Sequence, residues 1–429
     1  LAAWSASAPS QDSLALRGVF ADAFGTQFRD HLSTTRLAQQ LSDYEVQNCF
    51  LQVCVLGEGY YKSDILPRAA GMPIGYNDPL GDLLNELKAK NAKVRVHAWI
   101  SPLQAHNARA IVRPQENHVV VKHPEWLTKD IEGNQADANG WVYLDPGHPE
   151  VQDYVVSIVK ELAGSQPIAG ILIDGLQYPE QGARFGYNEK ALERFRAETG
   201  AKGTPDPMDP AWMEWRRTQL TKLLTRIFRE VKESNPDMIV SATAKAGGPA
   251  PRTEEGFKFS TPYVAYLQDW LSWAEFDMAD WIILQNFCDE QIESNQFDDW
   301  TRFAVANRAD TKLWIAVAGY QNWAIDAFFQ IQRALINDAD AVAVYNFRQP
   351  VRDIATTSDF FAAVQSVTLL PQREIAAVAG APSASLQERM ARMQQALEQS
   401  QIALAEKELA PGVSTSLPMQ AEKRPTPVP

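Results

Sequence analysis

Short apolar runs alternate with helical patterns along most of the chain, and this alternation constrains the fold more than any other feature. Each run has the length of one strand, and the segments between runs carry the spacing of helices that cover a sheet. The eight runs are residues 14–20, 47–55, 94–100, 168–174, 238–244, 281–286, 312–318 and 340–347. Strands that alternate with helices predict an α/β fold with a parallel sheet.

Several of these runs are apolar on both strand faces, notably 282–284 and 341–344. A strand buried on both sides has this composition, which is typical of parallel sheets covered by helices. Eight strands with helices between them match a (β/α)8 TIM barrel, which tolerates long loop insertions. A doubly wound open sheet is the alternative, but no glycine-rich phosphate-binding loop follows the first run.

Two connections are too long for plain loops, namely 101–149 and 175–236. Long insertions after barrel strands usually build the binding face. The second contains a predicted helix that starts near Asn188 and ends at Gly200, where glycine commonly follows a helix. We assign residues 14–370 to one barrel domain, preceded by a flexible segment at 1–13.

The composition changes beyond residue 370. Residues 371–385 are rich in Ala, Pro and Ser and predict a linker, and the prolines of 411–429 predict a disordered tail. Between them, residues 386–410 predict an amphipathic helix with an apolar stripe at Leu386, Met390, Met393, Leu397 and Leu404. We expect this helix to dock on the barrel or on a partner, with self-association as a coiled coil as the alternative.

The overall composition excludes several classes of protein. The 429 residues carry a formal net charge of −13, whereas a nucleic-acid binder needs a basic surface. Since no apolar run approaches the roughly 20 residues of a membrane helix, we expect no membrane span. The three cysteines, Cys49, Cys54 and Cys288, are too few for a disulfide framework and lack paired CxxC spacing.

The chain opens at Leu1 rather than Met. This fits an exported protein whose signal peptide has been removed, and it also fits a cloned fragment. We expect an exported protein, located in the periplasm, at the cell surface or outside the cell. Lipid anchoring through a removed N-terminus is left open.

Asp174 is the sharpest candidate for a functional residue. Active sites of TIM barrels form where strands end and their following loops begin. Asp174 ends an otherwise apolar run. A carboxylate there loses hydration, so it needs a hydrogen-bonding or charged partner or serves a function. The alternative is a capped or salt-bridged aspartate that supports the loop. Other polar residues at strand ends are Asp22, Glu58, Thr243, Lys245, Asp289, Glu290, Tyr345 and Arg348.

Several carboxylates, several aromatic residues and few cations suit a neutral polyhydroxylated ligand such as a sugar. Glycosidic cleavage uses one protonated carboxyl as acid and a second carboxylate as base or nucleophile. Asp174 would take one of these roles. Asp289 or Glu290 is the first candidate for the second carboxylate, and Glu58 is the next. The residues expected to line the sugar site are Tyr61, His97, Trp99, Gln285 and Tyr320. By contrast, Trp212, Trp215, Trp270 and Trp273 have helical spacing and are expected in the core.

Five of the six histidines lie between His97 and His148, but no HxH or HExxH pair at ligand spacing is present. We therefore expect no metal and no cofactor, and a metal-dependent hydrolase that uses this segment is a further alternative. For His97 itself, a hydrogen-bonded core histidine is the alternative to a site residue. No GxSxG motif supports a serine hydrolase.

Seven short runs match a known pattern: RGVF (17–20), QVCVLGEGYYKS (52–63), YNDPL (76–80), HAWISP (97–102), HPEW (123–126), LDPGHPEVQDYV (144–155) and GILIDGLQYP (170–179). A looser match covers 269–287. Taken together and in this order, they resemble the glycosyl hydrolase-like 10 family of bacterial envelope proteins, whose catalytic domain is a TIM barrel. The resemblance covers roughly residues 16–367 and leaves the tail unmatched.

The resemblance implies an activity and several roles. Members of the family cleave glycans, some of them peptidoglycan strands, and are often secreted or lipid-anchored. By resemblance, Asp174 takes the position of the family's strand-four Asp, and Glu58 stands where the family usually carries Asp. Asp145, in the DPG turn, either shapes that turn or contacts ligand. It joins Tyr178 among the expected substrate-binding residues.

Two departures from the family pattern affect the mechanism. Gly175 stands where the family usually has a second acid, and Cys54 stands where it tends to carry Arg. We expect an exported glycoside hydrolase that acts on a peptidoglycan-like polysaccharide through carboxylates. The alternative is a glycan-binding or scaffold protein that is weakly active or inactive.

Overall fold

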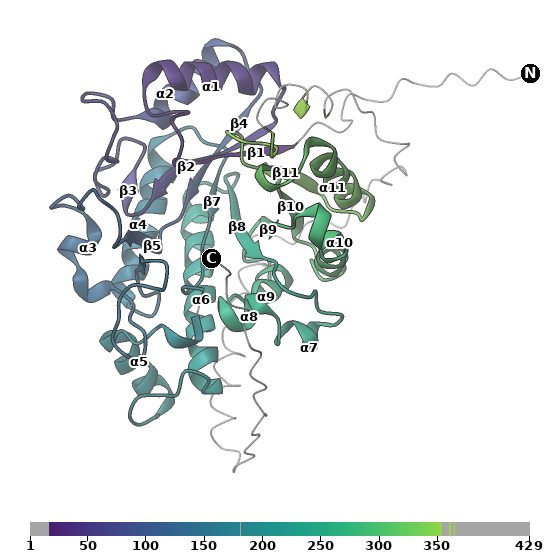
Figure 1. Cartoon of the computed structure of the whole chain (residues 1–429). Coiled ribbons are helices and arrows are strands. Elements are labelled where there is room, and N and C mark those ends of the chain that lie inside the picture. Colours follow the sequence, from purple (N-terminus) through teal and green to yellow (C-terminus); the bar gives the residue numbers. More distant parts are fainter. Residues whose placement is uncertain (1–16, 181, 354–359, 362–363, 365–429) are drawn as a thin grey trace, which may run out of the picture.

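The computed structural model describes residues 17–180, 182–353, 360–361 and 364, and Figure 1 shows the chain as a ribbon. The expected N-terminal segment (1–13), linker (371–385), amphipathic helix (386–410) and tail (411–429) lie outside the described residues. Among the described residues, no helix combines the length and the apolar composition needed to cross a membrane.

Eight parallel strands form a closed barrel. Each strand pairs with the next, and β1 pairs in parallel with both β2 and β11, which closes the ring. The strands are β1 (Gly18–Ala21), β2 (Asn48–Val55), β4 (Arg95–Ile100), β7 (Gly170–Ile173), β8 (Ile239–Lys245), β9 (Trp281–Asn286), β10 (Lys312–Ala318) and β11 (Ala341–Tyr345). The TIM-barrel prediction is confirmed, and the doubly wound alternative is wrong because β1 and β11 are hydrogen-bonded.

Helices surround the barrel (Figure 1). The longer ones are α1 (His31–Asp43), α2 (Pro79–Ala89), α4 (Pro149–Ser165), α5 (Glu189–Thr199), α6 (Pro210–Ser234), α10 (Glu290–Ala306) and α11 (Ala324–Ile336). The short ones are α3 (Val119–Lys122), α7 (Glu254–Phe257), α8 (Thr261–Ala265), α9 (Trp270–Glu275), η1 (Pro124–Trp126), η2 (Gly182–Arg184) and η3 (Gly319–Gln321).

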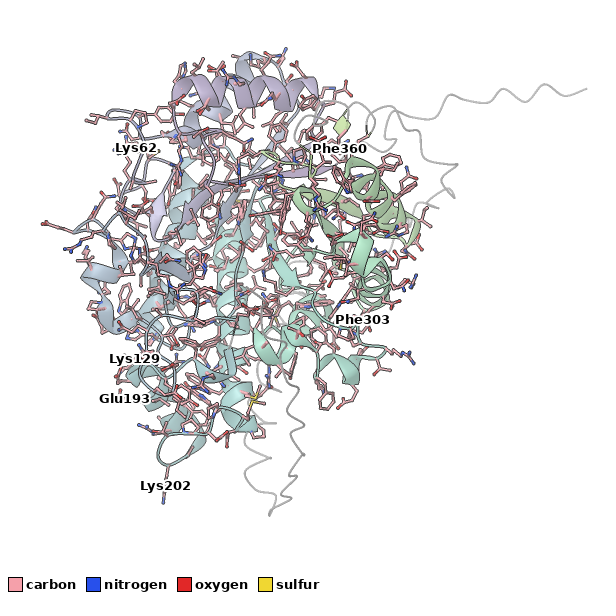
Figure 2. All side chains as sticks on the ribbon, in the orientation of Figure 1. Lys62, Lys129, Glu193, Lys202, Phe303 and Phe360 are labelled. Carbon is pink, nitrogen blue, oxygen red and sulfur yellow. The ribbon has the colours of Figure 1, made fainter. Side chains whose placement is uncertain are left out.

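Loop insertions extend the carboxyl end of the barrel. β3 (Glu58–Gly59) folds back antiparallel on β2. The connection after β4 forms a hairpin of β5 (Gln104–Asn107) and β6 (Trp141–Tyr143). Figure 2 shows side chains over the described fold, with Lys202 pointing outward from the loop between α5 and α6.

Local sequence signals fix the ends of several helices. Asp30, Asp78 and Asp209 each accept a hydrogen bond from a backbone amide in the first turn of α1, α2 and α6. The predicted helix between Asn188 and Gly200 is confirmed: Asn188 caps α5, and Gly200 follows it with φ of 78°. Glycine adopts this left-handed backbone without the steric cost of a side chain.

Two apolar layers hold the structure together. The barrel interior contains Phe20, Phe50, Trp99, Leu172, Ile283 and Trp314, and the rings of Trp281 and Trp314 stack with centroids 4.7 Å apart. The other faces of the strands pack against the helices. The prediction that Trp212, Trp215, Trp270 and Trp273 are core residues is confirmed, since none is more than 1% exposed.

Candidate active site

A polar layer lies at the carboxyl end of the barrel, directly above the apolar interior. Side chains alternate between the two faces of a strand, so a residue two positions beyond an interior residue also faces inward. The interior residues Phe20, Phe50, Trp99 and Leu172 are followed two positions later by Asp22, Gln52, Ser101 and Asp174, respectively. The change from apolar to polar residues marks the mouth of the barrel.

Asp174 is the centre of this layer. Its half-buried carboxylate accepts four hydrogen bonds from four neighbouring positions. Oδ2 accepts from Trp99 Nε1 and Ser101 Oγ, both at 3.1 Å. Oδ1 accepts from Thr243 Oγ1 at 2.7 Å and Gln285 Nε2 at 3.0 Å. An ionised carboxylate has about four lone-pair sites and accepts only, so these donors match its ionised form.

The network continues from Asp174 to the first strand. Gln52 Nε2 donates to Ser101 Oγ at 3.3 Å, and Gln52 Oε1 accepts from the backbone amide of Ala23 at 3.0 Å. The adjacent Asp22 is fully buried, and its Oδ1 accepts from the amides of Phe24 and Gly25. Polar contacts therefore cross the mouth from β9 to β1.

Tyr345 lies between the two aspartates of the mouth. Its ring centroid is 6.0 Å from that of Trp99, whose indole binds Asp174. Burial, followed by the carboxylates of Asp22 and Asp174, raises the pKa of the Tyr345 phenol. Arg348 faces Asp22, with Nη2 3.7 Å from Oδ2. This side of the mouth thus combines aromatic rings with one cation.

Lys245 and Glu180 form the opposite side. Gln268 joins the loop after β7 to the end of β8, because it accepts from the amide of Lys245 and donates to the carbonyl of Leu176, both at 3.0 Å. Burial lowers the pKa of Lys245, while the carboxylates of Asp174 and Glu180 act to raise it. The ammonium of Lys245 therefore lies within electrostatic reach of both carboxylates, and Glu180 itself is exposed.

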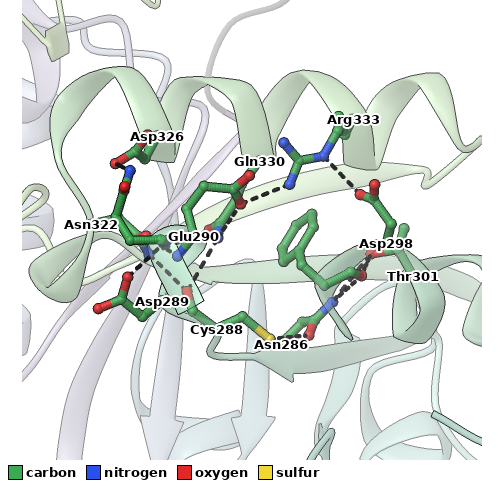
Figure 3. Close-up of polar contacts among 12 residues, drawn as sticks. Asn286, Cys288, Asp289, Glu290, Asp298, Thr301, Asn322, Asp326, Gln330 and Arg333 are labelled. Atoms are coloured by element: carbon green, nitrogen blue, oxygen red, sulfur yellow. Dashed lines mark hydrogen bonds and ion pairs between the residues drawn. The ribbon is translucent and has the colours of Figure 1, made fainter. Parts of the chain in front are cut away.

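The predicted second carboxylates Asp289 and Glu290 have contacts on the side of α10 and α11 (Figure 3). Asp289 caps α10 by accepting from the amide of Gln291. Glu290 pairs with Arg333 at 2.7 Å and accepts from Gln330 Nε2 at 3.1 Å. In this arrangement both carboxylates support the start of a helix, and neither is among the described partners of Asp174.

Glu58 and Tyr61 also have partners away from Asp174. Glu58 Oε2 accepts from the amide of Ala70 at 2.9 Å and so joins β3 to a neighbouring loop. The buried Tyr61 donates from its hydroxyl to Glu161 of α4 at 2.6 Å. Both contacts stabilise the loop around β3.

The remaining strand-end predictions are distributed over two levels of the barrel. Trp99 and Gln285 contact Asp174 directly, and Tyr320 is 38% exposed beside Tyr345. His97 lies one layer deeper, fully buried, with Nε2 3.0 Å from Asn48 Oδ1. Burial lowers the pKa of His97 to about 3. His97 therefore lies in the core as a hydrogen-bonded histidine, which was the alternative to a site residue.

Asp145 and Tyr178 meet beneath the loops, with the Tyr178 hydroxyl 3.5 Å from Asp145 Oδ1. Both are buried, and Asp145 Oδ1 also accepts from the amide of Gly147 at 2.8 Å. Asp145 therefore shapes the DPG turn that precedes α4, which is one of its two expected roles. Burial raises the pKa of Asp145 to about 6, although the Gly147 amide and the charge of Arg216 act to lower it.

We expect Asp145→Asn to change how stability depends on pH. Since the ordinary pKa of 3.8 is raised to about 6, the folded state binds this proton more tightly than the unfolded state. The stabilisation by the protonated Asp145 is fully present below about pH 4, is lost as the pH rises through about 6, and does not change further above that. The free energy of unfolding of the wild type should therefore fall by on the order of 3 kcal/mol, and Asp145→Asn should lack this fall. Urea unfolding of both proteins between pH 4 and 7 measures it, and parallel curves would contradict it.

Histidines of the first insertion have structural contacts. His118 caps α3, its Nε2 lies 2.8 Å from the carbonyl oxygen of Leu56, and His123 stacks on Trp126 with centroids 3.8 Å apart. The indole of Trp126 donates to Glu150 at the start of α4. Within the described ranges, no three His, Cys, Asp or Glu side chains are grouped as metal ligands.

The two departures from the family pattern lie in different places. Gly175 has φ of +66°, and a Cβ there would meet no atom within 4 Å, so a longer side chain would enter open space. Cys54 is buried in the layer between the barrel and the helices. The departure that concerns the mouth is therefore Gly175, directly after Asp174.

Ser101, Gln52 and Glu180 are not among the residues predicted from the sequence. The first two could have been found by counting two residues onward from each apolar interior position, since alternation predicts which side chains face inward. Glu180 lies on a loop six residues beyond Asp174, where no periodicity operates. Its place depends on backbone contacts such as the one between the Tyr178 amide and the Tyr266 carbonyl.

Two solved structures with a similar fold are glycoside hydrolases. The glycoside hydrolase domain of PgaB (BpsB) from Bordetella bronchiseptica matches with a TM-score of 0.57 at 15% identity, over 83% of this chain and 99% of that one. An alpha-L-fucosidase from Paenibacillus thiaminolyticus matches with a TM-score of 0.56 at 14% identity, over 82% and 48% of the two chains. The chain thus has a TIM-barrel fold shared with glycoside hydrolases.

The glycosyl hydrolase-like 10 model matches residues 15–335, and the chain belongs to this family. The glycosyl hydrolase DigH of Escherichia coli K12 is 26% identical over 297 residues, which are 64% of this chain and 63% of that protein. YngK of Bacillus subtilis, also named a glycosyl hydrolase, is 27% identical over 175 residues, or 41% and 31% of the two chains. The chain therefore matches less than two thirds of each relative's length.

Proposed function

We propose that the protein is an exported glycoside hydrolase that cleaves a bacterial envelope glycan of the peptidoglycan type. The observation that carries the proposal is the carboxylate of Asp174, held by four side-chain donors at the mouth of the barrel. Family membership and the glycosyl hydrolase relatives support the reaction class. The choice of glycan and the exported location rest on the resemblance to envelope proteins.

The contacts of Asp174 favour one catalytic role over the other. A general acid must carry a proton, whereas a base or a nucleophile must be ionised. Four donors stabilise the ionised carboxylate of Asp174, so it fits the base or nucleophile. Because the donors come from β4, β8, β9 and the residue after β4, they also fix the orientation of the carboxylate toward a bound sugar.

Glu180 fits the complementary role of general acid. It is exposed on the loop that leaves Asp174, and Lys245 lies within electrostatic reach of both. Tyr143 and Tyr266 lie close enough to Glu180 that its charge adds to burial in raising their pKa values. In this proposal Asp174 supplies the base or nucleophile, Glu180 supplies the acid, and the phenols of Tyr143 and Tyr266 supply hydrogen-bonding groups for the sugar.

The test of the proposal is direct. Purified peptidoglycan glycan strands incubated with the protein should gain new reducing ends with time. A second candidate function is glycan binding without cleavage, which the open space beside Gly175 favours, since the family's second acid is missing there. Retention of strands by the protein with no increase in reducing ends would support this second candidate and contradict the first.

A further inference from the structure

We propose that an aromatic row on the β10–β11 side of the mouth, formed by Tyr345, Tyr320 and Trp323, is a binding platform for pyranose rings of a glycan chain that extends away from Asp174. The inference rests on the proposed action on glycans and adds a second binding region to it. Trp323 has no role in the Asp174 network described above.

The inner part of the row leads outward from the candidate catalytic carboxylate, and Trp323 follows Tyr320 by three residues, directly before α11. The indole of Trp99 binds Asp174, and its ring centroid is 6.0 Å from that of Tyr345. Tyr345 in turn is 6.0 Å from Tyr320. The exposed fraction rises along the row, from 2% for Trp99 to 38% for Tyr320 and 47% for Trp323. Such a gradient runs from the barrel interior to solvent.

The outer ring is held in place before any ligand binds. The guanidinium of Arg352 lies 5.3 Å from the centroid of the Trp323 ring, and the Arg352 amide donates to the Asn322 carbonyl at 2.6 Å. Asn322 is itself buried and donates to the carbonyl of Cys288 at 2.9 Å (Figure 3). It also donates to the carbonyl of Ala318 at 2.9 Å. A ring fixed in this way loses little conformational entropy on binding.

Tyr320 and Trp323 expose a large part of their aromatic side chains to solvent. Contiguous exposed apolar surface on a soluble protein marks a binding site, and aromatic rings dominate the energetics of such contacts. The apolar face of a pyranose ring can cover one aromatic face while its hydroxyls remain in water. We assign a glycan to this surface because the row begins beside Asp174, the carboxylate proposed to act in glycan cleavage.

The experiment measures how affinity depends on chain length. In an Asp174→Asn background, which prevents cutting, calorimetry gives the affinity for glycan fragments of two, four and six sugars from peptidoglycan strands. We expect affinity to rise with fragment length. Trp323→Ala should lower the affinity for the longest fragment about tenfold and leave the affinity for the shortest nearly unchanged. Trp323→Phe, which keeps an aromatic face, should restore most of the loss.

Phe329→Ala is the matched control, since Phe329 is 49% exposed on α11 just beyond Trp323. Unchanged binding of the longest fragment by Phe329→Ala, together with the loss in Trp323→Ala, supports the platform. Equal affinities of Trp323→Ala and its parent at every length would overturn it, and so would an equal loss in both alanine variants. Wild-type protein that makes no reducing ends would contradict cleavage only, since the length dependence is measured without turnover.

Discussion

Asp174→Asn is expected to abolish the release of reducing ends from glycan strands, with a loss of at least about 100-fold, while the melting temperature stays nearly unchanged. An amide cannot act as base or nucleophile. The stability should survive because the asparagine oxygen can still accept from Trp99 and Ser101. Its NH2 group would then face Thr243 and Gln285.

The surroundings of Asp174 can adapt to that NH2 group. Among the described residues, Gln285 Oε1 is buried without a hydrogen-bond partner, so a flip of the Gln285 side chain would present an acceptor. The hydroxyl of Thr243 can accept as well as donate. Asp174→Ala provides the contrast, since it leaves four donors without an acceptor and should lower stability as well. Near wild-type cleavage by Asp174→Asn would remove Asp174 from the mechanism.

The barrel could be predicted from the sequence because its cause is local. Each strand is buried on both faces, so apolar runs such as 281–286 and 312–318 mark strands without reference to distant residues, and their bounds match β9 and β10. Asp174 could be predicted for the same reason, as a charged residue that ends an apolar strand. In both cases burial dictates the residue type directly.

Glu180, the second carboxylate proposed above, could not be predicted in this way. Asp289 and Glu290 follow β9 at the position where a catalytic acid is expected, but α10 begins at Glu290 and directs its side chain to Arg333. Which way a side chain points after a strand depends on where the next helix starts. Glu180 depends on contacts between loops 176–178 and 266–268, and no sequence periodicity reports such long-range contacts.

Glu180→Gln is expected to lower the rate of strand cleavage by about 10²–10⁴-fold because it removes the proton donor for the leaving sugar. The same variant should retain most of its activity on an aryl glycoside built on a fragment of the same strands, since a phenolate leaves without protonation. Asp174→Asn should fail on both substrates. The alkaline limb of the pH–rate profile, which reports deprotonation of the acid, should also disappear in Glu180→Gln.

Glu193→Gln is the matched control, because Glu193 is an exposed glutamate on α5 whose partner is Lys190; its variant should cleave strands at the wild-type rate. Glu290→Gln separates the two candidates for the second acid. If Glu290 only supports α10, its loss should lower the free energy of unfolding by about 1–2 kcal/mol, as expected for a hydrogen-bonded charged pair, and leave the leaving-group dependence intact. If Glu290→Gln instead shows selective retention of aryl glycoside cleavage while Glu180→Gln behaves as wild type, the acid is Glu290, and the loop after β7 serves only to bind the glycan.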